Sequence, residues 1–306
     1  MPSDQLWKRE YRVVFPDIGL EYNNLGDDDA LKVSFDIAKD LTQDTNKCKL
    51  KLWNLKEESR KKIEVPDLVI EIYAGYRDNT GPKKIFRGSV VSSVTEDSGG
   101  DVTTELKLSD GQCAVRDSWF SVSFPPGTPG DTVIKAIADN MGLALVFGEG
   151  ATFGSFPNGF SYGGNGADML NAICYGSGCT WSIQNGVLNV ILAGGVTTNR
   201  GIVFSASSGL LGSPKRIVHS DHKADKESQK RKRRKKEKKE KPDKKAGWKI
   251  QTLLAPTVSP GDAVKVESRM INGWFRVETA KHTGDIDDKW TSEFELIEGL
   301  ADDGSK

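Results

Sequence analysis

The sequence predicts a mainly β protein that contains one small α+β module. Two long segments alternate apolar and polar residues with the period of two that marks a half-buried strand. The segment between them changes to helical spacing, and the 32 glycines among 306 residues suit many short strands joined by tight turns. We therefore expect a first antiparallel β-barrel over residues 1–113 and an α+β module over 114–200. A second barrel, similar to the first, should follow over 201–300, and a polar tail over 301–306.

The first segment alternates most clearly over residues 31–37. In the next alternating run, 48–55, the leucines at positions 50 and 52 share one face of a strand and the lysines at 49 and 51 share the other. The polar stretch 56–62 favours a short helix. Further strands are expected at residues 11–15, 68–73, 85–94 and 102–108. Together with the two alternating runs they make a barrel of about six strands.

The middle segment places apolar residues at helical spacing over residues 132–141. Asp131 or Thr132 can cap this helix and Gly142 can end it. A second helix is expected at 167–175. Around the turn at Asn185 the pattern returns to two short strands, and we expect both helices to pack on one face of that hairpin.

The last segment alternates over 263–267, 273–278 and 290–296, with turn residues before each of the first two runs. Adjacent residues on a strand face opposite sides. We therefore expect Phe275 to point inward, in phase with Val277, and Trp274 to point outward. Earlier strands of the same barrel are expected at residues 202–204, 215–218 and 248–253.

A basic insert interrupts the second barrel over residues 219–247. The whole chain has 43 basic and 43 acidic residues, yet between Lys215 and Lys245 there are 16 basic and 6 acidic ones. The insert region thus carries a net charge of +10 and the remainder −10. An acidic body can keep DNA from adhering, so we expect the insert to project away from any DNA channel and, being almost without apolar residues, to be poorly ordered.

The densest part of the insert is a candidate partner-contacting loop. It has no aromatic residues, so it offers no stacking to bases. Three interpretations stay open: a solvated or protein-contacting loop, non-specific phosphate binding, and attraction to a membrane surface. The candidate residues are Lys230, Arg231, Lys232, Arg233, Arg234, Lys235 and Lys236.

Catalytic, metal and cofactor signals are absent from the sequence. The three histidines form no catalytic motif, and His282 is expected between two strands. The aspartates at 27–29 and 285–288 lack the full spacing of a calcium loop. The four cysteines lack zinc spacing, so we interpret them as buried, reduced thiols. We predict no catalytic residues, no metal, no cofactor and no enzyme, and the sequence has neither a membrane span nor the apolar core of a signal peptide.

Several short motifs occur in a fixed order along the two alternating segments. In the last segment they are S-P-G-D-x-V-x-V-E-S, I-N-G-x-F-R-V-E, H-T-G-D and W-x-S-E-F-E, which resemble the last barrel of the baseplate hub proteins of contractile-tailed bacteriophages. In the first segment, C-K-L-K-L-W-N-L-K-E-E-S-R and I-F-R-G-x-V are similar to the first barrel of the same family. The resemblance spans residues 8–296, and the basic insert departs from it.

The resemblance implies a structural role. In that family three copies form a ring, and two similar barrels per copy give a pseudo-hexameric face to the tail tube, while the threefold axis meets the central spike. The implied partners are further copies of the chain, the spike protein, the tube or tube-initiator protein and the tape measure protein, with DNA only in transit. The implied location is the tail baseplate of the virion, assembled in the host cytoplasm.

Three tryptophans are candidate interface residues, because large aromatics often anchor interfaces: Trp274, Trp53 and Trp290. Two alternative functions are kept. One is a peptidoglycan-binding or peptidoglycan-degrading tail component, since residues 129–143 resemble the sugar-binding lysin motif. The other is the hub of a tailocin or related contractile injection system.

Overall fold

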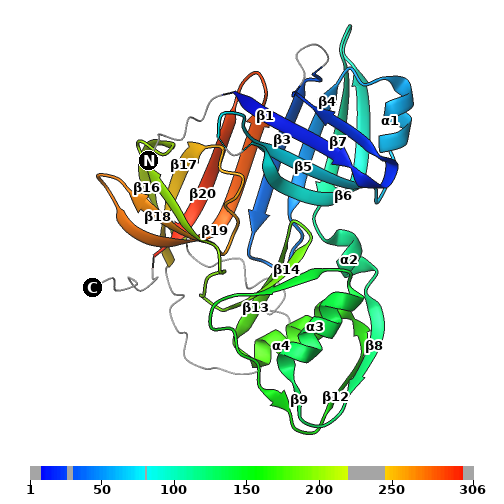
Figure 1. Cartoon of the computed structure of the whole chain (residues 1–306), viewed down its shortest axis with the longest axis vertical. Helices are drawn as coiled ribbons and strands as arrows, with labels where there is room; N and C mark the ends of the chain where they lie inside the picture. Colours follow the sequence, from blue (N-terminus) through cyan, green and yellow to red (C-terminus); the bar gives the residue numbers. More distant parts are fainter. Residues whose placement is uncertain (1–7, 26–29, 80, 220–244, 299–306) are drawn as a thin grey trace, which may run out of the picture.

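The computed structural model describes residues 8–25, 30–79, 81–219 and 245–298. These residues form a mainly β protein, as predicted, with a 13-stranded sheet and a smaller α+β module below it in Figure 1. Buried apolar side chains gather in three clusters. One cluster lies in the N-terminal half of the sheet, one in its C-terminal half and one in the module.

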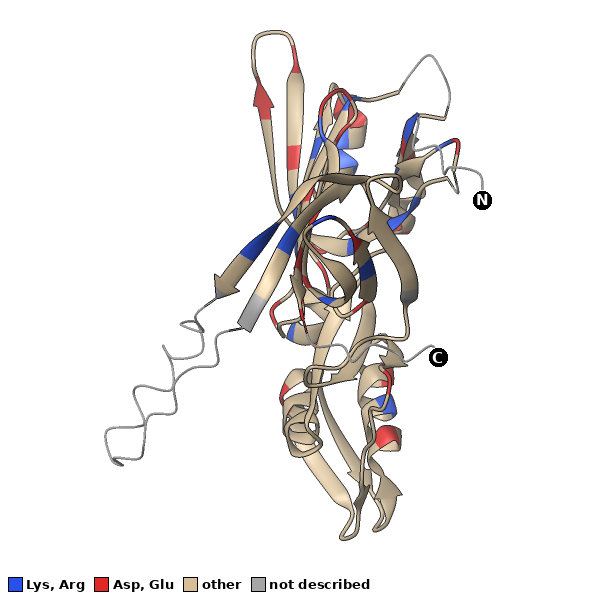
Figure 2. Cartoon of the chain, turned by 90° about the vertical axis from the view of Figure 1, so that its left-hand side faces the viewer, with Lys and Arg blue, Asp and Glu red and all other residues tan. Residues whose placement is uncertain are grey.

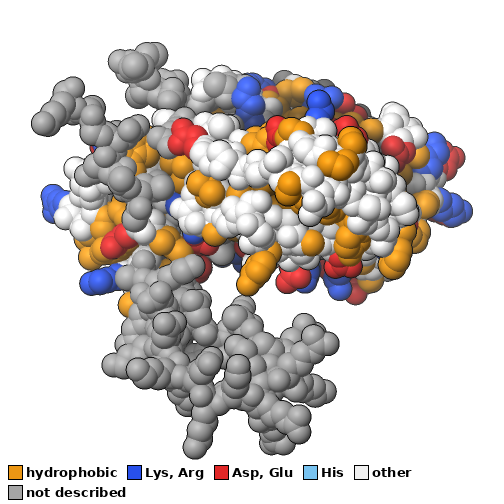
Figure 3. Space-filling view, turned by 90° about the horizontal axis from the view of Figure 1, so that it is seen from below, with side chains coloured by type: hydrophobic (Ala, Val, Ile, Leu, Met, Phe, Trp, Pro, Cys, Tyr) orange, Lys and Arg blue, Asp and Glu red, His pale blue; other side chains and the backbone are white. Residues whose placement is uncertain are grey.

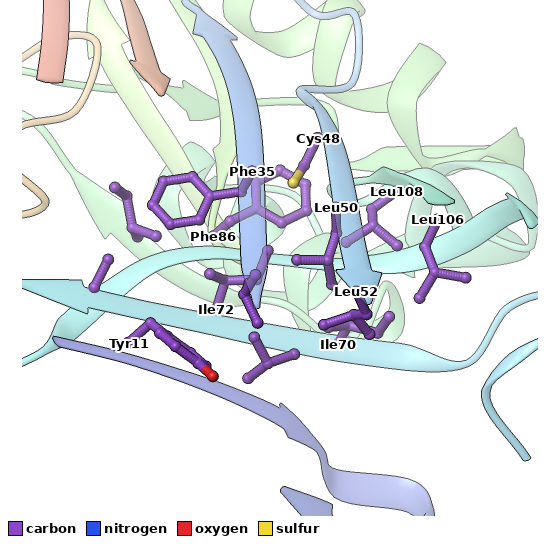
Figure 4. Packing of buried hydrophobic residues seen from close by; sticks show 14 of the residues in the cluster. Tyr11, Phe35, Cys48, Leu50, Leu52, Ile70, Ile72, Phe86, Leu106 and Leu108 are labelled. Atoms are coloured by element: carbon purple, nitrogen blue, oxygen red, sulfur yellow. The ribbon is translucent and has the colours of Figure 1, made fainter. Parts of the chain in front are cut away.

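The N-terminal half contains seven strands in the spatial order β3-β4-β7-β6-β5-β1-β2. Alternating leucines, isoleucines and phenylalanines fill its core (Figure 4), which follows from the period-two pattern. The elements are β1 (Arg9–Phe15), η1 (Pro16–Ile18), β2 (Leu20–Asn23), β3 (Val33–Asp40), β4 (Lys47–Trp53), α1 (Glu57–Ile63), β5 (Val69–Tyr76), β6 (Lys83–Asp97) and β7 (Val102–Ser109).

The C-terminal half has the order β16-β17-β20-β19, with β18 and then β15 continuing from β19. Its elements are β15 (Arg200–Ser205), β16 (Leu210–His219), β17 (Lys245–Leu253), β18 (Ala263–Glu267), β19 (Asn272–Asp285) and β20 (Trp290–Ile297). The pair β15–β18 is parallel, whereas we expected antiparallel strands only. The turn residues that we expected before the run 273–278 were 271–273. In the structure the turn lies earlier: Ser268 N donates to Ile271 O, and β19 already begins at Asn272.

The two halves share one sheet. The second part of β19 pairs with β3 over seven residues, from Thr279 opposite Asp40 to Asp285 opposite Ser34. Trp290 of β20 packs into the N-terminal core, with its ring centroid 5.4 Å from that of Phe35. Because backbone hydrogen bonds cross the boundary, the halves form a continuous surface; two separate closed barrels remain a prediction.

The module contains both predicted helices and the predicted hairpin. Asn165 caps the second helix by accepting from Ala167 N, and Trp181 is buried beneath the helices with Nε1 donating to Asn171 Oδ1 at 2.8 Å. The short strands on its lower side were not predicted. Its elements are α2 (Gln112–Arg116), β8 (Trp119–Phe124), β9 (Thr128–Pro129), α3 (Gly130–Asn140), β10 (Ala144–Phe147), β11 (Ser155–Phe156), β12 (Phe160–Asn165), α4 (Gly166–Gly176), β13 (Cys179–Gln184) and β14 (Val187–Leu192).

All four cysteines are free thiols, as expected. Cys48, Cys174 and Cys179 are buried, but Cys113 is only half-buried, 3.2 Å from Ser89 Oγ. Burial raises the pKa of the Cys174 thiol to about 12. The three buried thiols therefore act as small apolar side chains.

Candidate assembly surfaces

The module is held to the sheet by a buried lysine. Period-two alternation places Lys39 on the same inward face of β3 as Ile37, and its side chain is 3% exposed. Its Nζ donates to Asn185 Oδ1 at 2.8 Å. Asn185 occupies the β13–β14 turn with a positive φ of 56°, a conformation that asparagine tolerates better than most residues. A strand of the sheet therefore holds the tip of the module's hairpin.

Two more side chains complete this junction. Asp110 accepts hydrogen bonds from the backbone N–H groups of Asn185 and Gly186 at 2.5 and 2.9 Å. The Asn46 side chain donates to Ile183 O at 2.8 Å and to Gln184 Oε1 at 3.0 Å. Buried polar groups are costly unless they are paired, so these bonds specify one orientation of the module.

Burial dominates the electrostatics of the junction. Desolvation lowers the pKa of Lys39 to about 8, although the nearby Asp110 carboxylate raises it. Desolvation likewise raises the pKa of Asp110. These shifts arise at a packed boundary between elements, where burial disfavours the charged form of each group.

His282 lies inside β19 and not between strands, which corrects our expectation. It is fully buried, and its Nδ1 is 2.8 Å from Ser292 Oγ, while its Nε2 has no hydrogen-bond partner. Burial, and to a smaller extent Lys39, holds its pKa well below the usual range. His282 is therefore a neutral core residue.

The outer face of the shared sheet carries alternating charges across the boundary between its halves. Asp36 on β3 pairs with Lys281 on β19 at 3.2 Å. Glu105 on β7 lies 3.4 Å from Lys49 and 3.3 Å from Lys51 on β4. On the C-terminal side, Lys249 of β17 pairs with Glu293 of β20 at 2.7 Å. Partly exposed pairs add little stability, but together they interleave charges of both signs on this face.

The candidate interface tryptophans fall in different environments. Trp274 and Trp53 are both half-buried, and the Lys32 ammonium lies 5.3 Å from the centre of the Trp53 ring. Trp290 is 3% exposed, because it lies in phase with the buried residues of β20. Its expected interface role is therefore wrong: it packs within this chain. Phe275 is buried in phase with Val277, as predicted.

The candidate basic loop, Lys230 to Lys236, lies outside the described residues. The strands that flank it are described: β16 and β17 form an antiparallel pair that ends with His219 opposite Lys245. The insert therefore connects the ends of a two-stranded hairpin in the C-terminal half of the sheet.

The lower side of the module is an uncharged surface that we did not predict. Its strands β8 and β12 form a two-stranded ribbon, and neither residues 118–130 nor residues 150–167 include a charged side chain. In Figure 3 this side is almost entirely white and orange. Trp119, the first residue of β8, is 74% exposed. Charged residues are depleted in the cores of protein interfaces, and their absence here was a signal available in the sequence.

Within the described part of the chain, no group of three or more His, Cys, Asp or Glu residues could hold a metal ion. A search of the same residues for a helix long and apolar enough to cross a membrane found none.

The fold is that of known phage tail proteins. A tail protein from Neisseria meningitidis MC58 aligns with a TM-score of 0.61 at 12% identity, over 95% of this chain and 97% of that one. The 43 kDa tail protein of prophage MuSo2 from Shewanella oneidensis gives 0.61 at 9% identity, with the same coverages. A component of the E. coli type VI secretion system gives 0.57 at 11% identity, over 90% and 76%. No protein-family model and no curated protein matches the sequence.

Proposed function

We propose that this chain is a structural hub of a contractile phage tail, in which three copies form a ring between the tail tube and the central spike. The observation that carries the proposal is the similarity of fold to two tail proteins over 95% of this chain. The motifs that resemble baseplate hub proteins occur in both halves of the sheet and support the same role.

A ring of three such chains would adapt two symmetries. Apart from β2, each chain supplies two halves of a sheet with the same strand order, so three chains would present six similar units to a sixfold tube. The chain as a whole repeats only three times, which suits a threefold spike. Closure of the ring also covers strand edges that would otherwise be exposed.

We infer that the outer face with alternating charges belongs to the DNA channel. Lys49, Lys51, Lys249 and Lys281 each lie beside a carboxylate, which weakens the attraction of this face for phosphate and favours the passage of DNA without adhesion. The negative charge of the chain outside the insert is therefore not concentrated on this face, which pairs Asp36 with Lys281 and Glu293 with Lys249.

Reconstruction of the assembled tail tip tests the proposal. We expect three copies of this chain in a ring, with the tube on one side and the spike on the other. A symmetric dimer or a hexamer of this chain in the particle would refute it. Co-purification with tagged tube and spike proteins tests the two partners separately.

The similarity to a type VI secretion component supports a second candidate, the hub of a tailocin or other contractile injection system. The chain would have the same place between tube and spike, but no DNA would pass through it. Electron microscopy of the particles distinguishes the two, because only a phage carries a DNA-filled capsid.

We further propose that the chain is not an enzyme. Three groups whose pKa values depart far from the ordinary, Lys39, Cys48 and His282, are buried in the sheet and at the module junction, where no substrate could reach them. Purified protein should neither lyse peptidoglycan nor hydrolyse nucleotides. Turnover that disappears with His282→Ala in a folded variant would refute this statement.

A further inference from the structure

The two halves of the sheet share one strand order, with two differences: β2 has no counterpart, and β15 runs parallel to β18 whereas β1 runs antiparallel to β5. The N-terminal half has the order β3-β4-β7-β6-β5-β1, and the C-terminal half has β16-β17-β20-β19-β18-β15. Each half has one long strand that forms a hairpin with the next strand: β6 with β7 in the N-terminal half, and β19 with β20 in the C-terminal half. In both, the hairpins β3–β4 and β16–β17 complete the same side of the sheet.

Irregularities in the strands align the halves residue by residue. The β6–β7 pairing shifts between Val90 and Ser92, and the β19–β20 pairing shifts between Val277 and Thr279. Three residues after each shift, a polar pair crosses the hairpin: Thr95 Oγ1 lies 3.0 Å from Thr104 Oγ1, and His282 Nδ1 lies 2.8 Å from Ser292 Oγ. Residues 92–97 of β6 therefore correspond to residues 279–284 of β19.

The corresponding edges differ in one respect. In β19 this segment pairs with β3, and its inward residues Ala280 and His282 are buried. In β6 the segment pairs only with β7 among the described residues, since pairing with β5 ends at Ser89. Val91 and Val94 on this edge are each 48% exposed. The β6 edge thus has the form of the β19 edge without the strand that covers it.

The strand that corresponds to β3 is β16. It pairs with β17 on one side, and no described strand pairs with its other side. Lys215 and Arg216 are exposed there, and Val218 is 60% exposed. The pairing of β16 with β17 is irregular between Leu211 and Lys215. Residues 215–219 of β16 therefore form the short regular part of the open edge.

We propose that the open edge of β6 pairs with β16 of a second copy of this chain, as β19 pairs with β3 within the chain. This inference rests on the proposed ring and specifies its contact. Transfer of the internal register places Ser93 opposite Val218, Val94 opposite Ile217, Thr95 opposite Arg216 and Glu96 opposite Lys215.

Charge complementarity identifies the occupant. The β6 edge ends in the exposed acids Glu96 and Asp97, whereas the β16 edge carries the exposed bases Lys215 and Arg216. In Figure 2 the β6–β7 hairpin, at the top, has red residues near its end, and the β16–β17 hairpin, at the left, has blue ones. Opposite charges across a strand pair stabilise it, and each chain carries both complementary edges. A head-to-tail contact of this kind repeats from copy to copy and can close a ring.

Disulfide capture tests the register. Residues directly opposite in an antiparallel pair have Cα atoms about 4.5–5.5 Å apart, within the range that a disulfide spans. The full-length double variant Val94→Cys/Ile217→Cys, oxidised at high concentration, should give bands of two and three chains on a non-reducing gel. The matched control Val94→Cys/Val218→Cys is one residue out of register and faces opposite sides, so it should give at least tenfold less product.

Mixing the two single variants gives a second check. Val94→Cys chains mixed with Ile217→Cys chains should form covalent dimers and nothing larger, because each chain then has one reactive edge. A charge exchange is the third: Glu96→Lys should reduce disulfide capture in the double variant, and adding Lys215→Glu should restore it.

The outcomes separate this inference from the proposed function. Because oxidation accumulates even a transient complex, absence of the in-register product overturns the β6–β16 contact. A threefold ring in the tail tip without that product would leave the hub function standing and refute only the contact. Equal yields from the in-register pair and its control would also overturn the contact.

Discussion

Removal of the charge of Lys39 should change how stability depends on pH. Burial lowers the pKa of Lys39 in the folded state to about 8, from the 10.5 that is ordinary for a lysine. Between these values the unfolded chain binds more protons than the folded one, so the free energy of unfolding rises with pH across this window. Below pH 8 the lysine is protonated in both states, and the buried charge lowers stability in full.

The difference between these two pKa values corresponds to about 3 kcal/mol of unfolding free energy over the whole window. Between pH 7.5 and 9.5 the stability of the wild type should rise by about 2 kcal/mol relative to Lys39→Met, which does not titrate. The free energy of unfolding must therefore be compared as the difference between the wild type and Lys39→Met at each pH. The buried thiol of Cys174, with a pKa of about 12, opposes the lysine above pH 9 in both of them.

Urea unfolding at pH 7.5, 8.5 and 9.5 measures this difference. Lys39→Arg is the matched control, since arginine stays charged throughout; it should lose the gain at high pH and be the least stable of the three proteins. A wild-type-minus-Lys39→Met difference that stays constant with pH would refute the reasoning, because it would mean that the ammonium group keeps its ordinary pKa in the folded junction.

Four further outcomes are expected. Phe275→Ala should lower the free energy of unfolding by about 3–5 kcal/mol and Trp274→Ala by much less; the reverse order would show that the two faces are misassigned. Because burial lowers the pKa of His282, its contribution to stability is complete above pH 6.5 and is lost as the pH falls from 6.5 toward the folded-state pKa. The difference in thermal unfolding midpoint between the wild type and His282→Leu should therefore decrease between pH 7 and pH 5. A difference that does not change with pH contradicts this. Deletion of residues 224–244 leaves β16 and β17 intact, so circular dichroism and the unfolding midpoint should not change, and loss of structure would make the insert part of the fold. If the uncharged side of the module contacts only proteins, wild type and Trp119→Ala should both stay in solution when mixed with purified peptidoglycan; sedimentation of the wild type alone would favour the sugar-binding alternative.

The alternating strands could be predicted from the sequence because burial on one face imposes a period of two. The same period held the signal for the junction. Lys39 follows Phe35 and Ile37 in phase with the buried face of β3, and His282 follows Ala280 in the same way on β19. A charged or polar residue in a buried phase predicts a buried polar contact, but its partner, Asn185, is 146 residues away and no local pattern connects the two.

Which strands pair, and in which direction, was harder to predict from the sequence. The parallel pairs β10–β14 and β15–β18 join short segments whose composition does not distinguish parallel from antiparallel neighbours. The candidate Trp290 shows a related limit. It is the first residue of an alternating run, and only the position of β20 beside the N-terminal core shows that its side chain is enclosed within the chain.

The shared strand β19 has a mechanical consequence. Its first part pairs with β18 and its second part with β3, while β20 runs along its other side. Backbone hydrogen bonds lie across the strands, so a pull along β19 loads the seven-residue joint with β3 in shear, and the bonds must yield together instead of one after another. A displacement imposed on one half of the molecule is therefore transmitted to the other half through the backbone hydrogen bonds of this joint.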